Sequence, residues 1–217
     1  MNLFGESLEA VFEAGGRSSL PAERVCATGI GLLRALRDTH AAGLVHRDLK
    51  PENFLVGGAA APSAAGGDKG APPAPDAPDV FLVDFGLSAP FSRERARKDA
   101  DGPPTTLRNI VGTSRYAPIA AHYGRAQLPA DDIEAVLYCL AYLARADRLP
   151  WQGLRLRDKK ARNSAVASIK LSTSTDALCA SCSYLLPFAT LARSGADPPD
   201  YDRLIELLRA AAAALHD

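Results

Sequence analysis

The sequence predicts a mainly α-helical domain that carries one or two short β-hairpins. Segments 19–42, 131–146 and 201–215 repeat apolar residues at the spacing of helices. Two shorter apolar runs, at 54–56 and 80–83, have the length and composition of strands. The chain has 217 residues, 47% of them hydrophobic, which is enough to bury one core. We therefore expect a single domain over residues 1–217.

The first long helix is expected to begin after Ser19, with Ser19 as its N-cap and Pro21 in its first turn. Its apolar positions then recur at helical spacing up to Ala42, at Val25, Leu32, Leu33 and Leu36. A helix in this place would hold the polar residues that follow it as a rigid loop.

The two apolar runs that come next predict a pair of short strands. Such a pair would bring Asn53, before the first run, and Asp84, after the second, to the same end. The residues between the runs, 57–79, are almost entirely Gly, Ala, Pro, Ser and Asp. Because this composition buries too little apolar surface to offset the entropy of ordering, we expect a disordered loop insertion.

The remaining elements follow from charge and periodicity. Residues 91–107 are charged and rich in turn formers, and Thr105 and Thr106 within them are candidate phosphorylation sites. Segment 131–146 predicts a buried helix whose acidic N-terminus suits the helix dipole. Segment 201–215 predicts a last helix that ends in an alanine run.

Composition sets limits on the partners of the chain. The formal net charge is +0, so nucleic-acid binding gains no support, and we expect neither a secretion signal nor a membrane span. A cytoplasmic protein is therefore expected; the basic cluster 157–162 would suit nuclear import, but an exposed helix face explains it equally well. Cys179 and Cys182 form a CxxC pair without a second pair, so we assign no metal to them.

Two motifs carry the chemistry. Residues 46–53 read His-Arg-Asp-Leu-Lys-Pro-Glu-Asn, and Asp-Phe-Gly follows at 84–86, directly after the second predicted strand. Together they are the phosphoryl-transfer motifs of protein kinases, and Lys50 favours the Ser/Thr class. Asp48 would accept the hydroxyl proton of the substrate, Lys50 would bring a cation to the γ-phosphate of ATP, and Asn53 and Asp84 would bind Mg²⁺. Four neighbours are expected to be structural or packing residues: His46, Arg47, Phe85 and Gly86.

Further motifs narrow the resemblance. Val-Gly-Thr-Ser-Arg-Tyr-Ala at 111–117 resembles a segment of the casein kinase I family. Most kinases instead carry Ala-Pro-Glu further on. The likeness continues through Leu-Pro-Trp-Gln-Gly-Leu at 149–154, Lys-Leu-Ser-Thr at 170–173 and Pro-Asp-Tyr at 199–201. Residues 1–9 are similar to the hinge of the family. The resemblance therefore implies the C-terminal lobe of a kinase, from the hinge onward.

The resemblance also implies roles for residues outside the two motifs. Leu3 would offer backbone groups to adenine, above an apolar floor made by Leu55 and Val83. Thr113 would hydrogen-bond near Asp48, and Asp132 would brace the backbone of the catalytic loop. Arg115 and Arg162 would form an anion pocket for acidic or phosphorylated protein substrates. A structural salt bridge for Arg115 and a solvated position for Arg162 stay open as alternatives, and Trp151 is most simply a core residue.

Two departures from the family and one omission qualify these expectations. Pro118 stands where the family usually has Ser, and Leu137 where it usually has Gly. No Gly-rich loop, strand lysine or partner glutamate precedes Met1, so we expect this chain by itself to be nearly inactive. An incomplete gene product is the favoured explanation, and a non-catalytic phosphopeptide-binding module is the alternative. A small-molecule phosphotransferase is a distant third.

Overall fold

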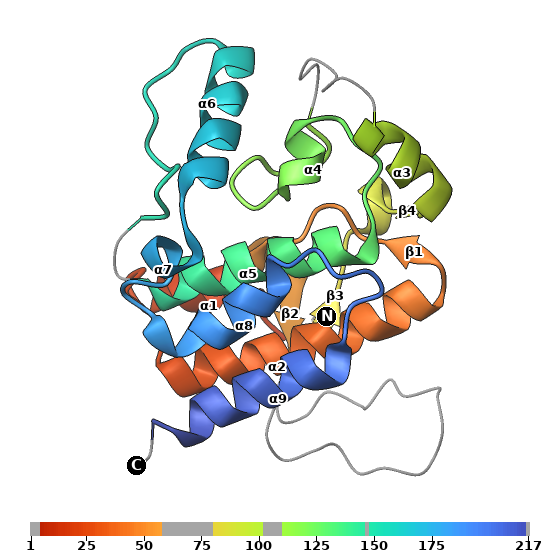
Figure 1. The fold of residues 1–217 in the computed structure, drawn as a ribbon. Coiled ribbons are helices and arrows are strands. Elements are labelled where there is room, and N and C mark those ends of the chain that lie inside the picture. Colours follow the sequence, from red (N-terminus) through yellow and green to blue (C-terminus); the bar gives the residue numbers. More distant parts are fainter. Residues whose placement is uncertain (1–4, 58–79, 102–109, 146–147, 216–217) are drawn as a thin grey trace.

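The computed structural model describes residues 5–57, 80–101, 110–145 and 148–215, and it is mainly helical, as the sequence predicts. Its body consists of three long helices, α2 (Ala22–Ala41), α5 (Pro129–Ala144) and α9 (Tyr201–Ala213). Helix α2 packs against both of the others, and the shorter α8 (Leu186–Ala192) packs on α5 and α9 (Figure 1). The three segments with helical periodicity are thus the three helices that share the core.

The core forms where apolar faces of these helices meet. Gly29 of α2 lies at this meeting point: a Cβ atom there would come within 2.7 Å of Leu208 on α9 and 2.8 Å of Leu140 on α5. The absence of a side chain therefore lets the helices approach closely. The α5 residues predicted to be buried have 0–2% exposed surface, namely Ile133, Val136, Leu137, Leu140 and Leu143.

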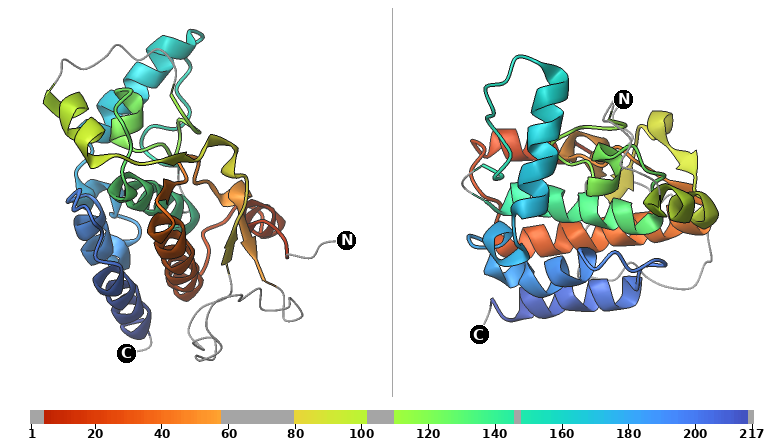
Figure 2. Two further views of the ribbon diagram at one scale, coloured as in Figure 1. Left: turned by 90° about the vertical axis from the view of Figure 1, so that its right-hand side faces the viewer. Right: turned by 45° about the horizontal axis from the view of Figure 1, so that its top comes forward.

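Two short antiparallel strand pairs lie beside the helices. Strand β2 (Phe54–Val56) pairs with β3 (Val80–Leu82), with Phe54 opposite Leu82, and β1 (Leu44–Val45) pairs with β4 (Ala89–Pro90). The view in the left panel of Figure 2 shows α2 between α9 on one side and the β2–β3 pair on the other. The predicted strand pair is confirmed, and it places Asn53 and Asp84 at the same end.

The N-terminal part of the described chain covers the strand pair. Helix α1 (Leu8–Ala14) begins at Ser7, whose hydroxyl accepts a hydrogen bond from the Ala10 amide at 3.2 Å. Ser7 also forms a bridge with Leu55, and the Val56 amide donates to the Glu6 carbonyl. Helix α1 contacts β2 and the 3-10 turn η1 (Pro51–Asn53), so it lies next to the motif-bearing loop.

The other described elements all follow the strand pair in chain order. The 3-10 turn η2 (Phe85–Leu87) and helix α3 (Arg93–Asp101) follow the strand pair, and α4 (Ile119–His122) packs against α6 (Lys159–Ser172). Helix α6 rises away from the helical body (Figure 1). Helix α7 (Thr175–Leu178) and the 3-10 turn η3 (Ser183–Leu185) connect α6 to α8.

The expected N-cap of the first long helix was wrong, and one helix was not predicted from the sequence. Helix α2 begins at Ala22 and its N-cap is Pro21, without a side-chain capping bond, so Ser19 does not cap it. Part of segment 91–107 is helical, since α3 gains a hydrogen bond from the Arg95 amide to the Ser92 hydroxyl and a Lys98–Glu94 pair one turn apart. Residues 58–79 of the predicted loop insertion, together with Thr105 and Thr106, lie outside the described residues.

In the part of the chain that the structure describes, we found no helix with the length and apolar character needed to cross a membrane.

Candidate active site

Asp48 is the centre of the candidate site. It lies in the loop between β1 and η1, with 6% of its surface exposed. One carboxylate oxygen, Oδ2, accepts a hydrogen bond from Lys50 Nζ at 2.9 Å. The other, Oδ1, accepts from the amide of Thr113 at 2.9 Å and from its hydroxyl at 2.8 Å. Both oxygens are thus held in place, and Thr113 joins the catalytic loop from a segment 65 residues later in the chain.

The backbone of this loop is held by Asp132 of α5, which is buried. Its Oδ2 accepts from the His46 amide at 2.7 Å, and its Oδ1 accepts from the Arg47 amide at 3.1 Å. The same Oδ2 lies 2.9 Å from His40 Nε2, on α2. A carboxylate that accepts several N–H groups in a buried place is both well solvated by the protein and fixed in orientation.

His46 links the two motifs. It is fully buried; its Nδ1 accepts from the Asp48 amide at 3.4 Å and its Nε2 lies 3.2 Å from the Val83 carbonyl. These contacts suit a neutral imidazole with its proton on Nε2. The ring of Phe85 lies 4.9 Å from the ring of His46, but 44% of Phe85 is exposed. Phe85 therefore contacts His46 while nearly half of its surface stays exposed.

The backbone of Gly112 lies close to the carbonyl group of Arg47. Arg47 has a positive φ of 68°, and its Nε donates to the Leu87 carbonyl at 2.5 Å. Gly112 has a φ of +87°, and a Cβ atom on it would lie 2.3 Å from the Arg47 carbonyl oxygen. Only glycine fits this position without displacement, which brings the next residue, Thr113, within reach of Asp48.

Lys50 lies among three acidic groups. Burial alone would lower its pKa, but the hydrogen bond to Asp48 and the charges of Asp48, Glu52 and Asp84 together raise it. The lysine therefore stays protonated near neutral pH and presents a positive charge beside the Asp48 carboxylate.

Asn53 and Asp84 offer oxygen atoms at the end of the strand pair. Asn53 is buried, its side-chain amide donates to the Asp48 carbonyl at 3.0 Å, and its own carbonyl accepts from the Val83 amide at 3.1 Å. The amide nitrogen is therefore occupied, and the amide oxygen is the atom suited to a cation. Asp84 is exposed and has a left-handed backbone, with φ 62°. One amide oxygen and one carboxylate fit the oxygen preference of Mg²⁺, which takes its other ligands from phosphates and water.

Two of the three residues expected to contact adenine lie among the described residues. Leu55, within β2, and Val83, directly after β3, are both half-buried. Leu3, expected to contact adenine through its backbone, lies outside the described residues. Gly86, in η2, is exposed, and a Cβ atom there would lie 3.2 Å from the Asp84 carboxylate.

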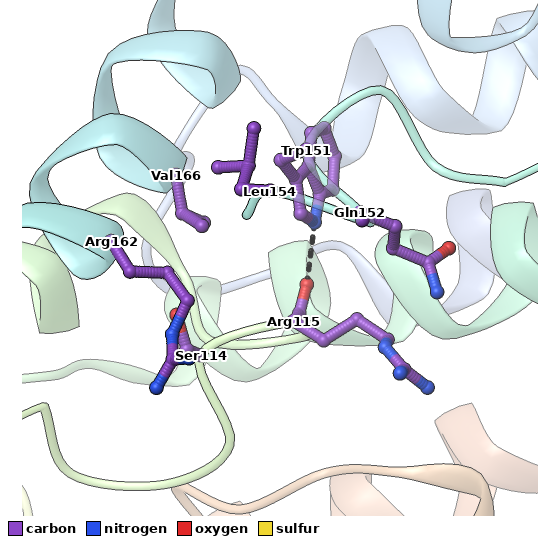
Figure 3. A pocket seen from close by; sticks show the side chains of 8 residues that line it. Ser114, Arg115, Trp151, Gln152, Leu154, Arg162 and Val166 are labelled. Atoms are coloured by element: carbon purple, nitrogen blue, oxygen red, sulfur yellow. Dashed lines mark hydrogen bonds between the residues drawn. The ribbon is translucent and has the colours of Figure 1, made fainter. Parts of the chain in front are cut away.

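The two arginines expected to bind anions line one pocket of about 240 Å³. Arg115 is half-buried and Arg162, on α6, is exposed. Their guanidinium groups lie on opposite sides of the pocket in Figure 3 and do not point toward each other. Arg115 lies over the rings of Tyr116 and Tyr142, with distances of 5.6 and 5.4 Å to the ring centres. Trp151 is buried, and its indole N–H donates to the Arg115 carbonyl at 2.8 Å.

Sequence reasoning missed the contacts of three polar residues that hold these parts together: His40 and Lys170, which are buried, and Tyr201, which is half-buried. His40 contacts Asp132, and its Nδ1 contacts the hydroxyl of Tyr201, at the start of α9. Lys170 on α6 bonds to the carbonyls of Ser114 and Ala117. Lys170 and Tyr201 both lie in stretches that resemble the family, but a short motif does not reveal which distant residue each side chain contacts. Among the described residues, no cluster of three or more His, Cys, Asp or Glu could hold a metal ion.

The loop that holds Asp48 next to Lys50, and the strand pair that carries Asn53 and Asp84, define a class of protein. The sequence profile described as "Protein kinase domain" matches residues 4–171, and the chain belongs to this family.

Within that family, the chain is similar to casein kinase I homologues. It is 32% identical to casein kinase I homolog 2 of Schizosaccharomyces pombe over 210 residues, which is 95% of this chain and 44% of that protein. It is also 32% identical to casein kinase I homolog 1 of Saccharomyces cerevisiae over 173 residues, 80% of this chain and 29% of the relative. The chain therefore spans less than half the length of these curated relatives.

Proposed function

We propose that this chain carries the phosphoryl-transfer half of a serine/threonine protein kinase of casein kinase I type. The observation that carries the proposal is the arrangement around Asp48, whose two oxygens are held by Lys50 on one side and Thr113 on the other. A carboxylate with fixed geometry beside a protonated lysine is what transfer of a γ-phosphoryl group to a hydroxyl requires.

In the proposed reaction, a Ser or Thr hydroxyl of the substrate attacks the γ-phosphorus of ATP, and the bond to the bridging oxygen of ADP breaks. Asp48 orients the hydroxyl and takes its proton. Lys50 stabilises the negative charge of the transferred group, and the raised pKa of Lys50 keeps that charge available. Thr113 keeps the carboxylate of Asp48 in the orientation that the hydroxyl needs.

Asn53 and Asp84 would hold Mg²⁺, which neutralises charge on the ATP phosphates when it is bound. Leu55 and Val83 would form part of the apolar surface under the adenine ring. The chain contains no G-x-G-x-x-G sequence that could cover the phosphates, so we propose that the 217-residue polypeptide, assayed by itself, is nearly inactive.

Acidic or phosphate-primed proteins are the proposed substrates. The support is the pocket beside Thr113, which two arginines line. Because Arg115 lies on the faces of two tyrosines, its guanidinium would have to turn toward the pocket for both arginines to contact one phosphate. Arg162 is exposed and free to reorient toward an anion.

Activity of a restored kinase tests the proposal. The chain by itself, and a fusion with the N-terminal lobe of an active casein kinase I ahead of Met1, would be assayed with radiolabelled MgATP and casein. We expect transfer by the fusion, and a loss of about 10²–10⁴-fold in rate on Asp48→Asn. Asp202→Asn, at an exposed position on α9, serves as the matched control and should leave the rate unchanged.

A non-catalytic phosphopeptide-binding module is the second candidate, favoured by the same arginine-lined pocket. It predicts that the fusion binds a phosphoserine peptide without turnover, and that Arg162→Gln weakens this binding. Phosphorylation of an aminoglycoside or choline, with none of casein, would instead indicate a small-molecule phosphotransferase.

A further inference from the structure

Lys170 is a fully buried lysine in the last turn of α6, with 0% of its surface exposed. Its ammonium lies 3.0 Å from the Ser114 carbonyl, 2.6 Å from the Ala117 carbonyl and 3.2 Å from His122 Nε2. An ammonium group has three N–H donors and no acceptor, so these three partners use all of them. A buried lysine is costly unless it is satisfied in this way.

Burial lowers the pKa of Lys170 to about 7, so the lysine is charged at about pH 6, and the groups around it accept that cation. Burial, and next the charge of Lys170, lower the pKa of His122 to about 3, so His122 is neutral and its Nε2 can accept a hydrogen bond. The ammonium also lies 4.6 Å from the ring centre of Tyr138 and 5.1 Å from that of Trp151. Such cation–π contacts stabilise a positive charge that has lost its water.

The chain segment that Lys170 holds is the one between the catalytic loop and the arginine-lined pocket. Its first residue, Thr113, bonds to Asp48, and the Thr113 carbonyl accepts from the amides of Tyr116 and Ala117 at 2.9 Å each. Trp151 holds the carbonyl of Arg115, between the two carbonyls that Lys170 holds. Three carbonyls of residues 114–117 are thus fixed by side chains from beyond the segment.

We propose that Lys170 is a positioning residue that fixes segment 113–117 between Asp48 and the arginine-lined pocket. Because α6 carries both Lys170 and Arg162, the same side chain also sets the separation between Arg162 and Arg115. This inference rests on the proposed function, in which residues 113–117 form the substrate-facing side of the site. Lys170 acts through the backbone of that segment and does not itself contact the reacting groups.

Lys170→Met is the variant that tests the inference, because methionine has a similar length and apolar stem but no N–H donor. It leaves the carbonyls of Ser114 and Ala117 without their donor, and we expect the segment to move until water reaches them. In the 217-residue chain at about pH 6, the amides of Tyr116 and Ala117 should then exchange with deuterium about 10- to 100-fold faster. Affinity for a phosphoserine peptide should fall by a similar factor.

Lys160→Met is the matched control: it removes one lysine charge from the same helix, at an exposed position. It should leave amide exchange at Tyr116 and Ala117 unchanged and alter peptide affinity less than about twofold. The urea midpoint of each variant separates local loosening from global unfolding. Unchanged exchange at both amides in folded Lys170→Met would overturn the proposal.

Two further measurements separate a failure of the proposed role of Lys170 from a failure of the proposed function. If Lys170→Met does not fold, ¹⁵N spectra of the native chain still decide: a hydrogen-bonded ammonium gives slowly exchanging Nζ protons, and their absence at about pH 6 would contradict the bonds of Lys170. If the native chain does not bind the phosphoserine peptide, the substrate part of the proposed function fails. Exchange at Tyr116 and Ala117 then tests the positioning role independently.

Discussion

At the level of single residues, backbone strain gathers at the proposed site. Among the described residues outside glycine, positive φ values occur at Arg17, Arg47 and Asp84, and the last two belong to the kinase motifs. Such conformations cost about 1–3 kcal/mol each and persist only where the surroundings enforce them. The bonds of Arg47 to Asp132 and Leu87 supply that constraint in the catalytic loop.

Gly112→Ala should be strongly destabilising, because it combines a positive φ with a contact of 2.3 Å to the Arg47 carbonyl. We expect the free energy of unfolding to fall by roughly 2–5 kcal/mol, measured by urea denaturation. Gly16→Ala is the control: its φ is +74°, but its Cβ would meet nothing within 4 Å, so the loss should be roughly 1 kcal/mol. Equal losses in the two variants would show that the close approach to Arg47 contributes nothing.

How far the sequence could predict the site depends on the range of each contact. Asp48, Lys50 and Asn53 lie within six residues of one another, so a short motif already predicted their neighbourhood. Lys170 holds carbonyls 53 and 56 residues away, and Tyr201 meets a histidine 161 residues away. No periodicity or local pattern encodes such pairings, because they depend on how the helices pack.

At the level of elements, three helices are joined by a chain of polar side chains, in which His40 and Asp132 are buried and Tyr201 is half-buried. His40 on α2 contacts Asp132 on α5 through Nε2 and Tyr201 on α9 through Nδ1. If Nε2 carries the proton toward the carboxylate, Nδ1 is the acceptor for the Tyr201 hydroxyl. Tyr201 thereby favours the imidazole tautomer that keeps Asp132 directed at the His46 and Arg47 amides.

Tyr201→Phe should loosen this chain without emptying the space that the ring occupies. It leaves His40 Nδ1 buried without its donor, so we expect a loss of about 1–3 kcal/mol in the free energy of unfolding. Hydrogen exchange at the His46 and Arg47 amides should also become faster. Arg203→Gln, which removes an exposed pair with Glu206 on the same helix, should cost less than about 1 kcal/mol. Unchanged exchange in Tyr201→Phe would exclude a role of α9 in bracing the loop.

Helices could be predicted from the sequence where their apolar periodicity was strong. The apolar periodicity of α2, α5 and α9 was strong enough to place all three helices close to their observed bounds. The start of α2 was mispredicted because Ser19 suits an N-cap in isolation, whereas Pro21 takes that position. Helix α3 was missed because its nine residues are almost all charged and have no apolar face to detect.

For the molecule as a whole, buried titratable groups oppose one another in their effect on stability. Burial, and next the charge of Lys170, lower the pKa of His122 from 6.5 to about 3, so its contribution to stability is lost as the pH falls below 6.5. Burial raises the pKa of Asp131 from 3.8 to about 7, so its contribution is lost as the pH rises through that range. Between pH 4 and 6.5, the contribution of His122 to the free energy of unfolding therefore rises with pH, whereas that of Asp131 falls.

Replacing His122 by Gln should reveal the pH dependence of stability that Asp131 contributes, because glutamine does not titrate. In the native chain, the contributions of His122 and Asp131 to the free energy of unfolding should largely cancel between about pH 4.5 and 6.5. In His122→Gln only the Asp131 contribution is left of this pair, and stability should rise as the pH falls. Urea denaturation at several pH values measures both curves. Asp131→Asn should give the reverse, with stability that falls on acidification. Parallel curves for the native chain and His122→Gln would mean that His122 titrates alike in the folded and unfolded states, and that Lys170 does not face a neutral imidazole.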